Sequence, residues 1–174
     1  LTAFVSKPLE VVPAWGAAEI TASRVIERTA RTLTRPVFDA DPLNLTLVVE
    51  IGDHHATLLD GDKLEALARF PTRFALHGGP KFTPDGRFVF FMSRDGWVEK
   101  YDLWSLEKIG EVRAGINARN IALSSDGKHI AVANYLPNSL VLLSAEDLGV
   151  EKVIDAVDLK GKSWLNPGTT VRTG

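Results

Sequence analysis

An internal repeat is the feature that most constrains the fold of this 174-residue chain. When FTPDGRFVFF is aligned with LSSDGKHIAV, Gly86 falls on Gly127, and the offset is 127 − 86 = 41. Both copies contain short apolar runs separated by turn residues. Repeats of roughly 40–50 residues that are built from short strands are typical of β-propeller blades. The sequence therefore predicts propeller blades over residues 41–157.

Short predicted strands occupy the whole of this region, and the turns between them contain residues that are typical of tight hairpins. Four Asp-Gly dipeptides, which start at Asp60, Asp85, Asp95 and Asp126, predict tight hairpins. Runs such as FVFFM and IAVA are apolar throughout, as expected for strands that neighbouring blades cover on both faces. About two and a half blades fit into the region, whereas closed propellers have about four to eight. The expected fold is all-β: an incomplete propeller with exposed blade edges.

The two ends of the chain read differently from the blades. The segment AAEITASRVIERTARTL has an apolar face formed by Ile20, Val25, Ile26 and Leu33, and Pro36 follows it. This pattern predicts one helix that ends before Pro36, within a helical linker over residues 1–40. Residues 158–174 lose the strand pattern, and we expect an irregular tail there.

Composition excludes several classes of partner. The formal net charge of −2 gives no reason to expect nucleic acid or an anionic membrane. The chain has no cysteine, so it contains no disulfide, no thiolate metal site and no c-type haem attachment motif. No apolar run approaches the ~18 residues of a membrane span.

The repeat brings the unusual polar residues to one face of the expected propeller. In a four-stranded blade, the turn after the second strand and the connection to the next blade lie on the same face. Arg94 follows a second strand, and the repeat offset leads from it to Asp53 (94 − 41 = 53) and to Tyr135 (94 + 41 = 135). His77 lies in a connection between blades, and the equivalent position, 77 + 41 = 118, is next to Arg119. The predicted site therefore includes His77, Arg94, Arg119 and Tyr135.

Each of these residues has a functional and a structural interpretation. His77 could bind a metal through a neutral imidazole, or hydrogen-bond the backbone of a neighbouring blade. Arg94 and Arg119 could clamp carboxylates through forked hydrogen bonds, or form inter-blade ion pairs with Asp95 or Glu99. Tyr135 could donate a hydrogen bond to a ligand, or cap a turn. Residue patterns alone leave these alternatives open.

From about residue 41 to 156 the chain resembles the eight-bladed haem d1 domain of the family that comprises cytochrome cd1 nitrite reductase, NirN and NirF. The resemblance rests on ALHGGPKFTPDGRFVF, SRDGWVEKYDLW, AGINARNIALSSDGK and NYLPNSLVLL. The N-terminal LTAFVSKPLEVVPAW resembles the end of the c-type cytochrome domain that precedes the propeller in nitrite reductase and NirN. Gly-Gly-Pro after His77, the Asp53-His54-His55 turn and NYLPNSL are closest to NirN.

The resemblance implies a role for each candidate residue. His77 matches the proximal axial ligand of the haem d1 iron, and the residues that match cofactor-binding positions are Arg94, Arg119, Tyr135, Lys81 and His55. The two arginines would hold carboxylates of the cofactor, and Tyr135 would touch its periphery. Lys81 lies near a position where nitrite reductases have another arginine.

A NirN-like protein would be a periplasmic oxidoreductase that dehydrogenates dihydro-haem d1 in the haem d1 biosynthesis of denitrifiers. Its expected partners are haem d1 or dihydro-haem d1 and a c-type cytochrome domain or electron carrier, and the resemblance leaves a homodimer open. In the family the c-type haem precedes this region and the distal histidines lie in later blades, so we expect this chain alone to be inactive. The alternatives are nitrite reduction to nitric oxide, non-catalytic carriage of haem d1, and a cofactor-free interaction propeller.

Overall fold

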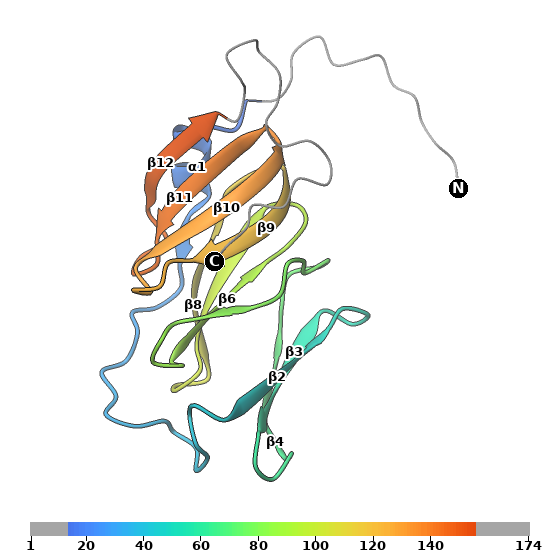
Figure 1. Ribbon diagram of the computed structural model, residues 1–174, viewed down its shortest axis with the longest axis vertical. Helices are drawn as coiled ribbons and strands as arrows, with labels where there is room; N and C mark the ends of the chain where they lie inside the picture. The colour runs from blue at the N-terminus through green and yellow to red at the C-terminus, as the bar shows by residue number, and fades with distance from the viewer. Residues whose placement is uncertain (1–13, 156–174) are drawn as a thin grey trace.

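Three antiparallel sheets make up the described residues, 14–155, of the computed structural model (Figure 1). The strands of the first sheet are β2 (Leu45–Glu50), β3 (His55–Asp60) and β4 (Ala66–Pro71). Those of the second sheet, in the order β1-β8-β7-β6-β5, are β1 (Val25–Ile26), β5 (Lys81–Phe82), β6 (Phe88–Met92), β7 (Trp97–Asp102) and β8 (Glu107–Arg113). Those of the third sheet are β9 (Asn117–Leu123), β10 (His129–Leu136), β11 (Ser139–Ser144) and β12 (Val150–Asp155). Each sheet is one blade, and the predicted all-β partial propeller is confirmed.

Within residues 14–155 the first blade has no counterpart of the strand that opens the other two. Subtracting the repeat offset from Phe88, the first residue of β6, leads to Leu47 within β2 (88 − 41 = 47), so β2 corresponds to the second strand of a blade. In the second and third blades, β5 and β9 precede that strand and contact each other. Among the described residues β2 pairs only with β3, and its other edge is free. This is one of the exposed edges that the sequence predicts.

The Asp-Gly dipeptides form turns, as predicted. Gly86, Gly96 and Gly127 have φ angles of 69°, 88° and 72°, a region that glycine enters without a steric penalty. Gly86 and Gly127 lie in the turns before β6 and β10, whereas Gly96 lies in the turn between β6 and β7. Gly61 follows β3 at the turn into β4. The four hairpins hold neighbouring strands in antiparallel register.

Strand β6 contributes side chains to both hydrophobic cores. Phe90 and Met92 belong to the cluster between the second and third blades, whereas Val89 and Phe91 belong to the cluster between the first and second blades. All four side chains are buried. Full burial of an apolar side chain of this size contributes roughly 1.5–3 kcal/mol. The continuous apolar run therefore reflects a strand that is covered on both faces, as the sequence predicts.

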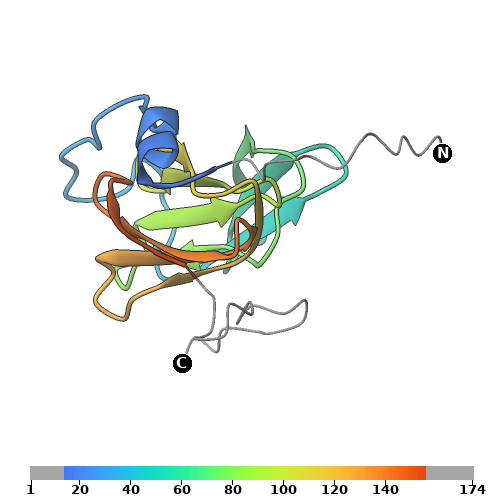
Figure 2. The ribbon, with the colours of Figure 1, turned by 90° about the horizontal axis from the view of Figure 1, so that it is seen from above.

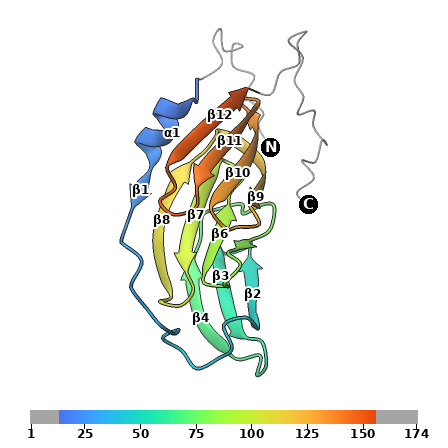
Figure 3. The same cartoon turned by 60° about the vertical axis from the view of Figure 1, so that its left-hand side comes forward.

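The prediction of a helix that extends toward Pro36 is wrong in its length. Helix α1 spans only Ala17–Ser23, and Arg24 is extended with φ −68° and ψ 125°. Val25 and Ile26 then form β1, which pairs with the outer edge of β8 (Figure 3). The edge of β8 offers unpaired backbone groups, and its Gly110 has no side chain to collide with the Val25 carbonyl. Pairing with an available edge therefore takes precedence over the helical periodicity.

The segment before the blades packs against them. Ile20 on α1 is fully buried in the core between the second and third blades, and the Trp15 indole donates a 2.9 Å hydrogen bond to the Arg113 carbonyl. Seen from above, α1 lies at the margin of the sheets near β8 and β12 (Figure 2). The helix is too short to cross a membrane, and it is the only one in the described range. The expected tail over 158–174 and the part of the expected linker that precedes position 14 lie outside the described residues.

Substitution of Gly96 tests the junction between the second and third blades. A Cβ atom at this position would lie 2.1 Å from the Gly115 carbonyl oxygen, and the φ angle is 88°. We expect Gly96→Ala to lower the free energy of unfolding by ~2–4 kcal/mol through left-handed strain and backbone collision. Denaturant unfolding of the full-length gene product measures this change. Gly52→Ala is the matched control, since its Cβ would meet no atom within 4 Å; equal losses in both variants would contradict the argument.

Candidate functional site

The turns and connections that carry the predicted site residues meet on one face of the propeller, which we call the site face. The N–H of Arg94, in the β6–β7 turn, donates to the carbonyl of Ala75 in the β4–β5 connection (3.0 Å). The carbonyl of Arg94 accepts a hydrogen bond from the N–H of Ala118 on β9 (2.9 Å). Ala75 and Ala118 are close in sequence to His77 and Arg119. The structure therefore brings together His77, Arg94 and Arg119, from three separate segments.

The backbone around His77 is held by the end of β6. The His77 N–H donates to the Met92 carbonyl (2.7 Å), and Leu76 pairs with Ser93 in an isolated bridge. Gly78 follows with a φ of 87°, and a Cβ atom there would lie 2.8 Å from the Asn120 side-chain oxygen. A side chain at position 78 would therefore disturb β9. The glycine lets the chain turn sharply after His77.

Both ring nitrogens of His77 contact Arg119. Nδ1 lies 3.1 Å from the Arg119 carbonyl oxygen, and Nε2 lies 2.9 Å from Nη1 of the Arg119 guanidinium. The alternative of a histidine that hydrogen-bonds a neighbouring blade is therefore realised here, since Arg119 belongs to the third blade. That contact does not exclude metal ligation, because the Arg119 side chain is exposed.

Arg94 and Tyr135 lie at equivalent positions of the second and third blades, in the β6–β7 turn and near the end of β10. Arg94 is exposed, and its guanidinium makes no hydrogen bond or ion pair with another residue in the range 14–155. The ion pairs considered for it do not form: Asp95 accepts a hydrogen bond from Ser93 Oγ, and Glu99 pairs with Lys108. Tyr135 is half-buried near the end of β10. Within residues 14–155 the Arg94 guanidinium is therefore an exposed cation without a charged partner.

Lys81 and His55 lie at the edges of this arrangement. The Lys81 ammonium donates to the Gly78 carbonyl (3.2 Å), which places its charge beside the turn that carries His77. His55 begins β3, and its Nδ1 lies 2.8 Å from the carbonyl oxygen of Asp53 in the β2–β3 turn. The Arg69 guanidinium binds the Asp53 carboxylate. His55 is thus on the site face but is engaged within its own blade.

A cavity of about 460 Å³ opens beside His77. Its volume falls within the roughly 300–1,000 Å³ of small-molecule sites. Apart from His77 itself, its wall consists of Leu47, Val49, Ile51, Leu76, Gly78, Gly79, Pro80, Phe91 and Met92. The wall residues from β2 and from the chain just after it are not among those predicted from the sequence. Their alternation at positions 47, 49 and 51 was the available signal, because alternate residues of a strand share a face.

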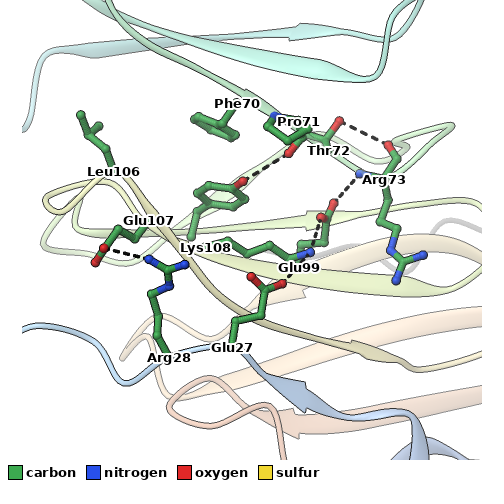
Figure 4. A pocket seen from close by; sticks show the side chains of 11 residues that line it. Glu27, Arg28, Phe70, Pro71, Thr72, Arg73, Glu99, Leu106, Glu107 and Lys108 are labelled. Carbon is green, nitrogen blue, oxygen red and sulfur yellow. Dashed lines mark hydrogen bonds and ion pairs between the residues drawn. The ribbon is translucent and has the colours of Figure 1, made fainter.

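A second cavity, of about 530 Å³, lies between the first and second blades and is strongly charged (Figure 4). Lys108 forms ion pairs with Glu27 (3.2 Å), Glu99 (3.1 Å) and Glu111 (2.8 Å). The Arg73 guanidinium also binds Glu111 and lies over the Trp97 ring at 3.9 Å. These charges already satisfy one another, so the cluster joins β4, β7, β8 and the N-terminal segment.

Comparison with known proteins identifies the relatives of this fold and site. The sequence profile described as "Cytochrome D1 heme domain" matches residues 40–172. This chain belongs to the cytochrome d1 haem domain family. Dihydro-heme d1 dehydrogenase of Pseudomonas aeruginosa is 59% identical over 152 residues, which are 87% of this chain and 31% of that protein. Protein NirF of the same species is 30% identical over 120 residues, or 68% of this chain and 31% of that protein.

Solved structures agree with this membership. The structure described as dihydro-heme d1 dehydrogenase NirN in complex with DHE has a TM-score of 0.86 and 56% identity, and the match covers 90% of this chain and 34% of that one. Hydrazine synthase of Kuenenia stuttgartiensis shares the fold, with a TM-score of 0.59. It is 18% identical, and the match covers 80% of this chain and 40% of that one. The chain therefore spans about a third of the length of the dihydro-heme d1 dehydrogenases that it matches.

The residues present fit the tetrapyrrole that the name of the d1 haem domain implies. No group of three or more His, Asp or Glu side chains within residues 14–155 is arranged to hold a metal ion. An iron whose equatorial ligands come from a macrocycle needs only an axial ligand from the protein. His77 beside an apolar cavity can supply that ligand, and the exposed Arg94 and Arg119 can receive peripheral carboxylates.

The charged cluster predicts a defined dependence of stability on pH. Burial acts to raise the pKa of Glu111, but hydrogen bonds from Arg73 and Lys108 outweigh burial and hold the pKa below its ordinary value of 4.5. Such a group contributes stability that is present above its unfolded pKa and is lost as pH falls through its folded pKa. Glu111→Gln should therefore lower the free energy of unfolding near neutral pH by about 1–3 kcal/mol. The difference from wild type should shrink as pH falls below 4.5.

Denaturant unfolding at several pH values between neutral and acid tests this expectation. The control is Glu107→Gln, because Glu107 pairs with Arg28, whose side chain is 46% exposed. An exposed pair of this kind contributes roughly 0–1 kcal/mol. A constant difference between wild type and Glu111→Gln across this pH range would show that the carboxylate charge has no stabilising role.

Proposed function

We propose that the full-length protein with this chain dehydrogenates dihydro-haem d1 to haem d1. The observation that supports this most strongly is 59% identity over 152 residues to dihydro-heme d1 dehydrogenase, against 30% for NirF. The site face adds a physical reason, because one imidazole, two exposed arginine side chains and an apolar cavity suit an anionic iron tetrapyrrole. The reaction removes two electrons and two protons from the substrate.

His77 is the proposed axial ligand of the substrate iron. Its backbone is fixed by the Met92 carbonyl, and His77 is one of the residues that line the cavity. A hydrogen bond from Nδ1 to a backbone carbonyl is the usual device that orients a metal-binding histidine, and the Arg119 carbonyl is placed to provide it. Held in this way, His77 would bind the substrate in one orientation relative to the rest of the site.

Arg94 and Arg119 are the proposed carboxylate clamps. Arginine forms paired, charge-assisted hydrogen bonds with carboxylates, and these are roughly twice as strong as neutral ones. Tyr135 would contact the periphery of the same ligand. Lys81 would add positive charge near the Gly78 turn, and His55 would face the ligand from the first blade. The clamps would fix the rotation of the tetrapyrrole about its iron–histidine axis.

The remaining parts of the reaction belong to the larger protein. We propose that residues 1–40 join these blades to a c-type cytochrome domain, whose haem carries the electrons away, and that the protein works in the periplasm. Distal residues that move protons would come from other blades. This chain would then supply the proximal side of the site, and it would not turn over substrate alone.

Titration with haem d1 tests the assignment of His77. Visible absorption should show stoichiometric binding to the wild-type full-length gene product and the spectrum of an axial histidine complex. His77→Ala should lose that spectrum and weaken binding at least ~10-fold, because even indirect partners of a metal ligand contribute ~10–100-fold. His129→Ala is the control, since His129 pairs with Glu151 away from the site face. Identical spectra for wild type and His77→Ala would exclude His77 as the ligand.

A further inference from the structure

Arg119 contacts both ring nitrogens of His77, and the two contacts together define the state of the ring. A guanidinium group carries only hydrogen-bond donors, so Nε2 must accept the 2.9 Å hydrogen bond from Nη1. The Arg119 carbonyl carries only acceptor lone pairs, so Nδ1 must donate to it at 3.1 Å. Only the neutral tautomer with its proton on Nδ1 satisfies both contacts. Nε2 is therefore the nitrogen whose lone pair can reach a metal.

The two contacts differ in how easily they can be broken. The carbonyl of Arg119 belongs to β9, which is paired with β10 and is tied to Arg94 through the adjacent Ala118. That contact does not depend on the side chain at position 119. The guanidinium, in contrast, ends a long and exposed side chain whose only hydrogen bond within residues 14–155 is the one to Nε2.

A guanidinium and an iron atom cannot use the same lone pair. If Nε2 binds iron, the Arg119 side chain must leave it. The cation that is released stays within reach of the site, because its backbone is fixed beside His77. A carboxylate on the arriving ligand is the partner that best satisfies a displaced guanidinium, since that pairing is bidentate and charge-assisted.

We propose that the Arg119 guanidinium blocks Nε2 of His77 in the ligand-free protein and is displaced when a ligand binds. We call the guanidinium in this role a guard, and the blocked histidine guarded. The guanidinium donates a hydrogen bond to Nε2 and so keeps the ring in the tautomer whose Nε2 lone pair can bind a metal. When the tetrapyrrole binds, Nε2 exchanges the guanidinium for iron, and the guanidinium moves to a carboxylate of the same ligand. The exchange rests on the proposed function, whereas the guarded state of the ligand-free protein does not.

Chemical modification of the ligand-free protein tests the guarded state. Diethyl pyrocarbonate acylates unprotonated imidazole nitrogens, and mass spectrometry of peptides follows each histidine separately. In the full-length gene product, Arg119→Met should raise the modification rate of His77 about five-fold, the factor that one typical net hydrogen bond is worth. Methionine has a similar length but no donor. Arg119→Lys, which keeps a donor, should remain close to wild type.

The matched control is Arg94→Met, which removes an arginine from the same face without touching His77. It should leave the His77 rate unchanged, and the rates of His54, His55 and His129 should stay constant in every variant. An unchanged His77 rate in Arg119→Met, or an equal rise in Arg94→Met, would overturn the proposal. Should Arg119→Met fail to fold, Arg119→Ala carries the same test.

Stopped-flow mixing with haem d1 tests the exchange itself. Without the guard, formation of the iron–histidine spectrum should be faster in Arg119→Met, and dissociation should also be faster because one clamp is lost. Arg94→Met should accelerate dissociation only. Slower or unchanged ligation in Arg119→Met would refute the exchange. If His77 is guarded but haem d1 binds equally well to His77→Ala, the assignment of His77 as the iron ligand fails while the guarded state remains.

Discussion

The arrangement of the candidate site depends on the backbone of Arg94. Its N–H and its carbonyl bind the backbones of Ala75 and Ala118, and so join the β4–β5 connection, the β6–β7 turn and strand β9. These are backbone hydrogen bonds, so they persist whichever side chain stands at position 94. The Arg94 guanidinium makes no hydrogen bond or ion pair within residues 14–155, and its proposed role is to bind a carboxylate of the ligand. The backbone and the side chain of one residue thus have separate roles in this proposal.

The hydrophobic core and the site are continuous through strand β6. Its alternate side chains fill the spaces on both sides of the second blade, and Phe91 and Met92 also form part of the cavity wall. The Met92 carbonyl then receives the N–H of His77. Because β6 is among the most deeply buried strands, it offers a rigid support for a ligand that must hold one geometry. The charged cluster around Lys108 adjoins this support, because its Glu99 on β7 is the cross-strand partner of Phe91 on β6.

Much of the site could be predicted from the sequence because repeated blades superpose. The repeat offset relates Arg94 to Tyr135, and equivalent positions in successive blades lie on the same face whatever the side chains are. Prediction from local periodicity, in contrast, failed for residues 24–36, where the spacing of apolar residues favoured a helix. Val25 and Ile26 pair instead with β8, and only the position of that strand's free edge decides this. The sequence of a segment does not show which edges will lie beside it.

The sequence by itself determined the all-β repeat, the turns at Asp-Gly, the face that carries the polar residues and the family to which they belong. These features depend on local propensity and on periodicity, which are properties of nearby residues. Only the tertiary structure decided the tautomer of His77, the engagement of its Nε2 by Arg119 and the cavity wall contributed by β2. Those features join residues that are far apart in the chain, 42 positions in the case of His77 and Arg119. Their distances and directions are fixed only when the blades pack against one another.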